Sequence, residues 1–199
     1  MPTSFLSRIH EIFNHRALRK VFLKLRVPLG VAFFLLILTQ LEEHWFFPGL
    51  IVAILGQMLQ VWCMSTIKTQ KKLTVTGPYM FVRNPMYLGR FFLILGVLVM
   101  TGNPWILIPF TVAYYLYMVN RVRREEKVLA ELFGEDYEAF RRDVRPYLPG
   151  FKRFDPRKLW SFNRESIHQN NVMTNIFLPI VGYIVLYLVT FVWPLPRLW

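Results

Sequence analysis

Two stretches of the chain hold polar residues whose types and spacing suit the binding of a charged ligand. In the first, Asn84 precedes Pro85, which is typical of a helix start with Asn84 as the N-cap. The free backbone N–H groups at such a helix end attract a negatively charged group. In the second, Arg121 and Glu125 are four residues apart and therefore lie on one face of a helix. Together the two stretches offer donors for an anion and a carboxylate for a cation.

Each stretch also has a purely structural interpretation. Gly77 with the proline that follows it is a turn signal, so the first stretch could be a simple turn anchored by Arg83. Arg121 and Glu125 could form an intrahelical ion pair worth about 0.2–0.5 kcal/mol, and Glu126 could lie on a solvated face. From the residues alone, both interpretations stay open.

Other kinds of chemistry find little support in the sequence. Cys63 is the only cysteine, so an intrachain disulfide is excluded and a small buried side chain is expected. The four histidines are scattered without metal-ligand spacing, so no metal is expected. The formal net charge of +12 could suit a nucleic acid, but the apolar residues come in long runs. We therefore expect basic residues at a membrane surface and no nucleic-acid partner.

The elements that position these residues are expected to be membrane helices. Hydrophobic residues make up 54% of the 199 residues, against about 45–50% in a soluble domain. A membrane span needs roughly 20 apolar residues, so five spans would occupy about half of the chain. The expected fold is all-α, a polytopic membrane helix bundle of about five transmembrane helices with a cytoplasmic amphipathic helix. Apolar runs cover 27–47, 47–67, 86–100, 105–119 and 172–193.

Turn residues predict how the third and fourth runs are joined and where the fourth helix ends. The Thr-Gly-Asn-Pro sequence at 101–104 predicts a tight helical hairpin. Beyond the fourth run, the helix is expected to continue until Gly134. The apolar pattern of Tyr137, Phe140 and Val144 then predicts an amphipathic helix that packs on the bundle or on the bilayer surface.

The basic residues are distributed unevenly between the two sides of such a bundle. Of the 24 Lys and Arg residues, 23 lie before residue 27, within 68–90 or within 121–164. Alternating spans put these segments on one side, and the positive-inside bias makes that side cytoplasmic. We therefore expect an integral multi-pass membrane protein with its N-terminus and functional segments in the cytoplasm and its C-terminus on the opposite side.

The two polar stretches belong to two longer blocks of residues. The first block reads Gly77-Pro78-Tyr79-x3-Arg83-Asn84-Pro85-x-Tyr87, and the second reads Arg121-x3-Glu125-Glu126-x2-Leu129-x3-Phe133-Gly134-x2-Tyr137, ending with Pro149. In the order and spacing of these blocks, over roughly 70–149, the sequence resembles the isoprenylcysteine carboxyl methyltransferase family and its phospholipid N-methyltransferase relatives. Members of this family are integral membrane enzymes that use S-adenosylmethionine.

The resemblance also implies how the chain is divided. We expect one membrane-embedded methyltransferase domain over 1–199. Within it, the family-like catalytic core with two spans occupies 71–149. A basic N-terminal segment with two spans precedes the core over 1–70, and a connecting segment with the fifth span follows it over 150–199.

The resemblance further implies which residues hold the cofactor and the methyl acceptor. Arg121 is expected to hold the acceptor's carboxylate, because an arginine at this position does so in the family. Glu125 is expected to face the S-adenosylmethionine cofactor. Supporting roles are expected for Gly77, Arg83 and Glu126. The expected cofactor-binding residues are Lys71, Lys72, Leu73, Thr74, Tyr79, Asn84, Pro85, Met86, Tyr87 and Glu125.

One departure from the family pattern bears on the reaction. The usual histidine before the proline is Asn84 here, and an asparagine cannot titrate near neutral pH. A carboxylate acceptor is already ionised and needs no base, whereas an amine acceptor must lose a proton. Asn84 and Arg121 therefore favour carboxyl O-methylation of an amphiphilic acceptor, either a membrane lipid or a lipidated molecule. The alternatives are phospholipid N-methylation and a non-catalytic membrane protein that retains the fold.

Overall fold

The described part of the chain is all-helical, as predicted. A computed structural model describes residues 16–67 and 72–196, and within those ranges it contains no strand. The α-helices are α2 (Arg16–Leu38), α3 (Glu43–Thr66), α4 (Pro85–Val99), α5 (Pro104–Asp143), α6 (Arg164–Gln169) and α7 (Val172–Phe191). Two short 3-10 helices are η1 (Gly77–Met80) and η2 (Pro156–Lys158).

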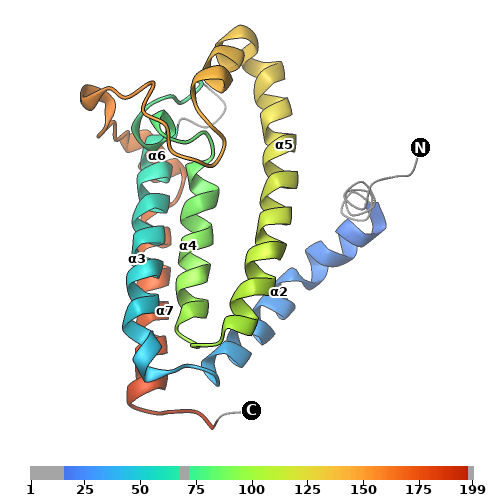
Figure 1. Cartoon of the computed structure of the whole chain (residues 1–199), viewed down its shortest axis with the longest axis vertical. Coiled ribbons are helices and arrows are strands. Elements are labelled where there is room, and N and C mark those ends of the chain that lie inside the picture. Colours follow the sequence, from blue (N-terminus) through green and yellow to red (C-terminus); the bar gives the residue numbers. More distant parts are fainter. Residues whose placement is uncertain (1–15, 68–71, 197–199) are drawn as a thin grey trace.

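The long helices bring the two polar stretches to one end of the molecule. Helices α3, α4 and α7 run side by side along its long axis, and α5 stands beside α4 (Figure 1). Helix α2 slants away from them. The connections 72–84 and 144–163 both gather at the end where α3 finishes and α4 begins. The charged half of α5 reaches the same end, so segments distant in sequence can form one site there.

Helices α3 and α4 approach each other closely because glycines line their contact. A Cβ atom added at Gly56 would lie 2.3 Å from the backbone nitrogen of Leu93. One added at Gly96 would lie 2.3 Å from the backbone nitrogen of Ala53. Small residues at such contacts let two backbones pack directly, an arrangement that is common between membrane helices. The close pair fixes the start of α4 relative to the end of α3.

We expect Gly56→Val to force α3 and α4 apart and to lower the free energy of unfolding by about 1–3 kcal/mol. Thermal unfolding of the detergent-solubilised chain measures this loss. Gly182→Val is the matched control, because a Cβ atom added at Gly182 would meet no described atom within 4 Å. Equal unfolding midpoints for the two variants would contradict a close contact between α3 and α4.

The predicted hairpin between the third and fourth apolar runs is confirmed. Gly102 adopts a φ of +61°, which favours glycine. The side-chain oxygen of Asn103 accepts a hydrogen bond from the backbone N–H of Trp105 at 2.9 Å and so caps the start of α5. Local turn chemistry is therefore enough to place this connection.

The predicted break at Gly134 is also confirmed. There the backbone leaves helical values, with φ 50° and ψ −123°, and the chain turns back toward α4 (Figure 1). The amphipathic pattern of Tyr137, Phe140 and Val144 forms a buried cluster after this break, and Leu73 packs against it. The returning part of α5 thus covers the segment that precedes η1.

The first two predicted apolar runs divide differently from expectation. Helix α2 ends at Leu38 and α3 begins at Glu43, so residues 43–47 belong to the second helix rather than to the first run. The cause is a turn at Thr39, whose N–H and hydroxyl both donate to the carbonyl of Leu36, at 3.3 and 2.8 Å. A polar side chain that bonds to its own backbone ends the first helix early.

The expectation of five membrane spans is not confirmed. Among the described residues, α3 and α7 are the helices long and apolar enough to cross a membrane. Helix α4 and the segment Val27–Leu38 are apolar but shorter. The apolar start of α5 continues without a break into a charged stretch that ends at Gly134. The helical fold and its apolar character are therefore established, whereas the number of spans is not.

Candidate functional site

Helix α4 begins where the sequence predicts, but the Asn84 side chain does not cap it. Pro85 is the first residue of α4 and is buried. Among the described groups, the Asn84 side chain makes no capping hydrogen bond. Its Nδ2 instead donates to Oε1 of Glu126 at 3.2 Å, 42 positions away. Asn84 thus occupies the N-cap position as predicted, but its side-chain contact is with α5 and not with the backbone of α4.

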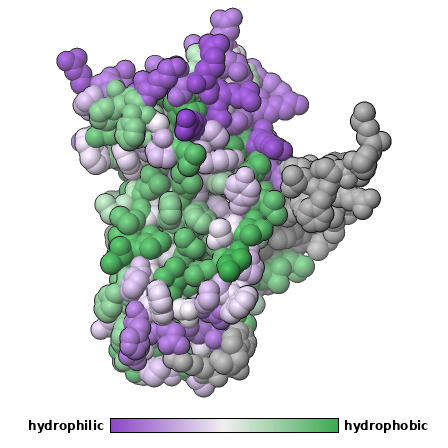
Figure 2. Space-filling view, in the orientation of Figure 1, coloured by the Kyte–Doolittle hydropathy of each residue, from purple (hydrophilic) through white to green (hydrophobic). Residues whose placement is uncertain are grey.

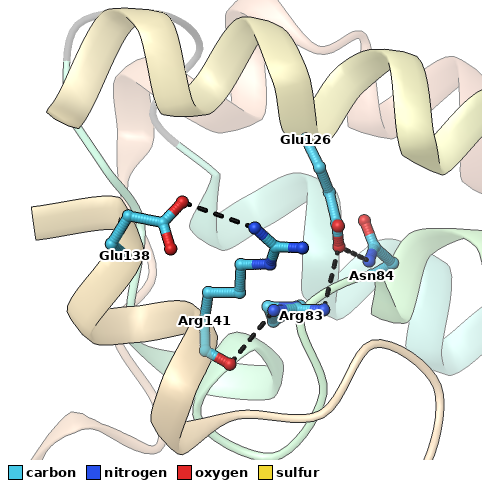
Figure 3. Close-up of polar contacts among 5 residues, drawn as sticks. All are labelled: Arg83, Asn84, Glu126, Glu138 and Arg141. Atoms are coloured by element: carbon cyan, nitrogen blue, oxygen red, sulfur yellow. Dashed lines mark hydrogen bonds and ion pairs between the residues drawn. The ribbon is translucent and has the colours of Figure 1, made fainter. Parts of the chain in front are cut away.

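The Glu126 carboxylate joins the two polar stretches and forms a first polar cluster with Arg83 and Asn84 (Figure 3). Nη2 of Arg83 lies 3.2 Å from the same Oε1 atom that Asn84 contacts. Nη1 of Arg83 donates to the carbonyl of Arg141 at 3.1 Å, on the returning part of α5. The side chains of Arg83 and Glu126 are only 8% and 16% exposed. A solvated face for Glu126 is therefore wrong, and Arg83 connects the residues before α4 to two parts of α5.

Removing the Glu126 carboxylate is expected to leave the Arg83 guanidinium largely buried without its charge partner. Glu126→Ala should lower the free energy of unfolding by about 1.5–3 kcal/mol, the range for a hydrogen bond to a charged group. Thermal unfolding in detergent measures the change. Glu131→Ala, at an exposed position of the same helix, is the control and should stay within about 0.5 kcal/mol. A loss no larger than that of the control would mean that Glu126 does not hold the stretches together.

A second polar cluster joins α4 to α5 through Tyr87, Arg121 and Glu125. Oη of Tyr87 donates to Oε1 of Glu125 at 2.7 Å, and Nε of Arg121 donates to the same oxygen at 2.8 Å. Nε of Arg121 also lies 3.3 Å from Oη of Tyr87. The predicted intrahelical pair thus forms, and Tyr87 extends it to a second helix. Because Arg121 and Glu125 are 46% and 40% exposed, the pair adds little stability and both groups are open to a ligand.

Tyr87 is positioned by aromatic residues that belong to neither polar stretch. Oη of Tyr114 donates to the backbone carbonyl of Tyr87 at 2.8 Å. The ring of Phe91 stacks on that of Phe110, with centroids 5.9 Å apart and planes 4° apart. Phe110 and Tyr114 are four residues apart in the 105–119 run, so their shared helix face was visible in the sequence. The sequence does not show that this face meets Tyr87 and Phe91 of α4.

Tyr79, in η1, offers a buried donor near the second cluster. It is 7% exposed, and its hydroxyl is buried without a hydrogen-bond partner among the described residues. Burial raises the pKa of Tyr79, and interaction with Cys63 and Glu125 acts in the same direction, so the hydroxyl stays protonated. Buried polar atoms rarely lack partners, so this hydroxyl could donate to an ordered water or to a bound ligand. Gly77, at a φ of +59°, provides the turn that η1 needs.

The segment before η1 lies against the end of α5. Leu73 packs on the buried aromatic cluster there, whereas Lys72 is exposed and Thr74 is half-buried. Met86, on the far side of the turn, is half-buried. Lys71 lies outside the described residues. The two stretches are thus in contact through Leu73.

Two cavities lie away from the polar clusters. One, of about 450 Å³, is polar and lies at the opposite end of the bundle, between residues of 40–45 and 101–104. The other, of about 320 Å³, is apolar and lies between α2, α4 and α7. Neither is lined by the polar clusters, so the candidate site depends on its converging polar groups and not on either cavity.

Comparison with known proteins agrees with the resemblance seen in the sequence. Residues 44–136 match the family model described as phospholipid methyltransferase. A probable protein-S-isoprenylcysteine O-methyltransferase of Oryza sativa subsp. indica is 29% identical over 128 residues, which is 57% of this chain and 67% of the rice protein. The protein-S-isoprenylcysteine O-methyltransferase of Saccharomyces cerevisiae is 32% identical over 113 residues, 51% of this chain and 47% of the yeast protein.

A third relative extends the similarity further along the chain. Protein-S-isoprenylcysteine O-methyltransferase B of Arabidopsis thaliana is 29% identical over 152 residues, which is 69% of this chain and 75% of the plant protein. The family match includes both polar clusters and the α3–α4 pair that positions them.

Proposed function

We propose that this chain, whose residues 44–136 match the phospholipid methyltransferase family model, is a membrane enzyme that methylates the carboxylate of an amphiphilic acceptor. Relatives named as protein-S-isoprenylcysteine O-methyltransferases support methyl transfer to oxygen. The observation that carries the proposal is the half-exposed cluster in which Tyr87 joins the Arg121–Glu125 pair. It offers an anion-binding guanidinium and a cation-binding carboxylate next to each other.

The residues present fit S-adenosylmethionine, which when bound would supply an electrophilic methyl group on a sulfonium. Glu125 would accept from its ammonium group, and the N–H groups at the start of α4 would suit its carboxylate. The unpartnered hydroxyl of Tyr79 would gain an acceptor, which supports a ligand at this position. The ring of Tyr87 would attract the sulfonium. Contacts from Lys71, Lys72, Leu73, Thr74, Pro85 and Met86 remain part of the proposal.

Arg121 would hold the acceptor. Its Nε atom bonds to Glu125 and Tyr87, and its two terminal nitrogens can donate to a carboxylate in a forked arrangement. Arginine stays protonated, so Arg121 binds and orients the acceptor but removes no proton. A carboxylate acceptor needs no base, which is compatible with Asn84. The bond from Asn84 to Glu126 supports a positioning role for this asparagine.

We further propose that the chain forms one domain over 1–199 that spans the membrane about five times, with the site in the cytoplasm. On the face shown in Figure 2, apolar side chains form a broad band across the middle of the molecule, and hydrophilic ones gather most densely at the end that carries the polar clusters. Exposed side chains of α7, such as Phe177 at 63% and Leu178 at 70%, suit contact with lipid. The basic residues of 121–164 lie at the hydrophilic end, which supports a cytoplasmic placement there and the C-terminus opposite.

Membranes containing the chain, incubated with S-adenosylmethionine labelled in its methyl group, test the reaction. The acceptor is a farnesylated cysteine with a free carboxyl group, and the matched control is the same compound with an amidated carboxyl. We expect base-labile label on the free acid and none on the amide. Base-stable label on phospholipid would indicate N-methylation instead, and an absence of transfer by folded protein would indicate a non-catalytic member of the fold. Either result would contradict carboxyl methylation.

A further inference from the structure

The segment after α5 exposes aromatic rings among basic side chains. Phe151 and Trp160 are 72% and 67% exposed, and Phe162 is 55% exposed. Figure 2 shows apolar side chains surrounded by hydrophilic ones at this end of the molecule. Large exposed rings outside a spanning helix are typical of an interaction surface. We define this aromatic–basic surface as Phe151, Phe154, Trp160 and Phe162 with Lys152, Arg157, Lys158 and Arg164.

The backbone beneath these rings is fixed to the end of α3. The ring of Trp62 stacks on that of Trp160, with centroids 5.5 Å apart and planes 29° apart. Nε1 of Trp62 donates to the carbonyl of Leu159 at 3.2 Å. The backbone N–H of Asn163 donates to the carbonyl of Ser65 at 3.0 Å. The aromatic–basic surface is thus held in place at one level of the bundle.

The length of α3 determines the depth of the aromatic–basic surface in the membrane. Its 24 residues span about 36 Å at 1.5 Å each, more than the roughly 30 Å of a bilayer's hydrocarbon core. If α3 crosses the membrane, its C-terminal end therefore reaches the headgroup boundary, and Trp62 and Ser65 lie within its last five residues. The aromatic–basic surface is bound to this end of α3 and lies at a similar depth.

The charges of residues 151–164 favour contact with an anionic surface. Between 151 and 164 there are five basic residues and one acidic residue, Asp155. Asp155 pairs with Lys158 at 3.1 Å, yet the Lys158 side chain is still 59% exposed. Aromatic rings favour the boundary between headgroups and acyl chains, and basic side chains favour anionic headgroups. A soluble protein partner would not require the surface to lie at bilayer depth.

We propose that the aromatic–basic surface lies in the headgroup region of the cytoplasmic leaflet, with its rings between lipids and its cations on anionic headgroups. This inference rests on the membrane placement proposed above. In this arrangement the segment 151–162 lies on the bilayer surface and does not cover the polar clusters. Anionic lipid would therefore hold this connection in place beside the site.

Site-directed labelling tests lipid contact directly. Because Cys63 is the only native cysteine, Cys63→Ala gives a background into which Phe154→Cys is introduced. The matched control is Glu135→Cys, at an exposed position beyond the break in α5. An environment-sensitive fluorophore is attached, and the chain is placed in nanodiscs of phosphatidylcholine with or without phosphatidylserine. We expect nitroxide-labelled lipid to quench the probe at 154 several-fold more than the probe at 135.

The charge contribution is tested by Arg157→Glu combined with Lys158→Glu. We expect this variant to reduce quenching at 154 in nanodiscs that contain phosphatidylserine and to leave it unchanged in pure phosphatidylcholine. Equal quenching at 154 and 135, or no effect of the charge reversal, would overturn the proposal. A probe at 154 that is shielded equally in detergent would instead indicate a protein cover. Since the readout is lipid contact, a labelled chain that contacts lipid but fails to bind S-adenosylmethionine would contradict only the proposed function.

Discussion

Arg121→Ala is expected to lower kcat/KM for the carboxylate acceptor about 30- to 700-fold while affinity for S-adenosylmethionine stays within a few-fold. The loss corresponds to about 2–4 kcal/mol, the range for removing one partner of a hydrogen-bonded charge pair. Turnover with a farnesylated cysteine and calorimetry with the cofactor measure the two effects separately. The fold should survive, because the Arg121–Glu125 pair is about half exposed and contributes little to stability.

Two variants control this prediction. Arg121→Lys keeps the charge but loses the two terminal nitrogens that donate together to a carboxylate, so it should recover only part of the rate. Arg123→Ala removes an exposed charge two positions away, on a different face of α5, and should turn over almost normally. Loss of cofactor binding in folded Arg121→Ala, or unchanged turnover, would contradict an acceptor-binding role for Arg121.

Glu125→Gln is expected to weaken binding of S-adenosylmethionine at least tenfold, about 1.4 kcal/mol. The substitution keeps the side chain's size and an oxygen that can accept from Tyr87, but it removes the charge that would meet the cofactor's ammonium group. Calorimetry on the detergent-purified chain measures the affinity. Glu131→Gln, an exposed position on the same helix, should leave it unchanged. An affinity equal to that of the unmodified chain would remove Glu125 from the site.

The features that the sequence predicts correctly are local ones. The start of α4 at Pro85, the hairpin at 101–104 and the break at Gly134 each follow from glycine, proline or asparagine at a position with a backbone requirement. The Arg121–Glu125 pair follows from helical spacing alone. These features need no knowledge of which helices are neighbours.

The features that the sequence does not predict depend on contacts between helices. The bond from Tyr87 to Glu125 joins positions 38 apart, and the bond from Asn84 to Glu126 joins positions 42 apart. Periodicity places each residue on a face but does not say which helix that face meets. For the same reason, the sequence places Asn84 at the start of α4 but does not show that its side chain bonds to a carboxylate on α5. The bond from Tyr114 to a backbone carbonyl on another helix leaves no signature in the sequence.

The central claim is that segments 72–87 and 121–126 together bind S-adenosylmethionine. Ultraviolet crosslinking of the methyl-labelled cofactor to the purified chain, followed by peptide mapping, tests it most directly. The account predicts adducts within those two segments that disappear when excess S-adenosylhomocysteine is added. Competed adducts confined to other parts of the chain, or no competed adduct from protein shown to be folded, would contradict it.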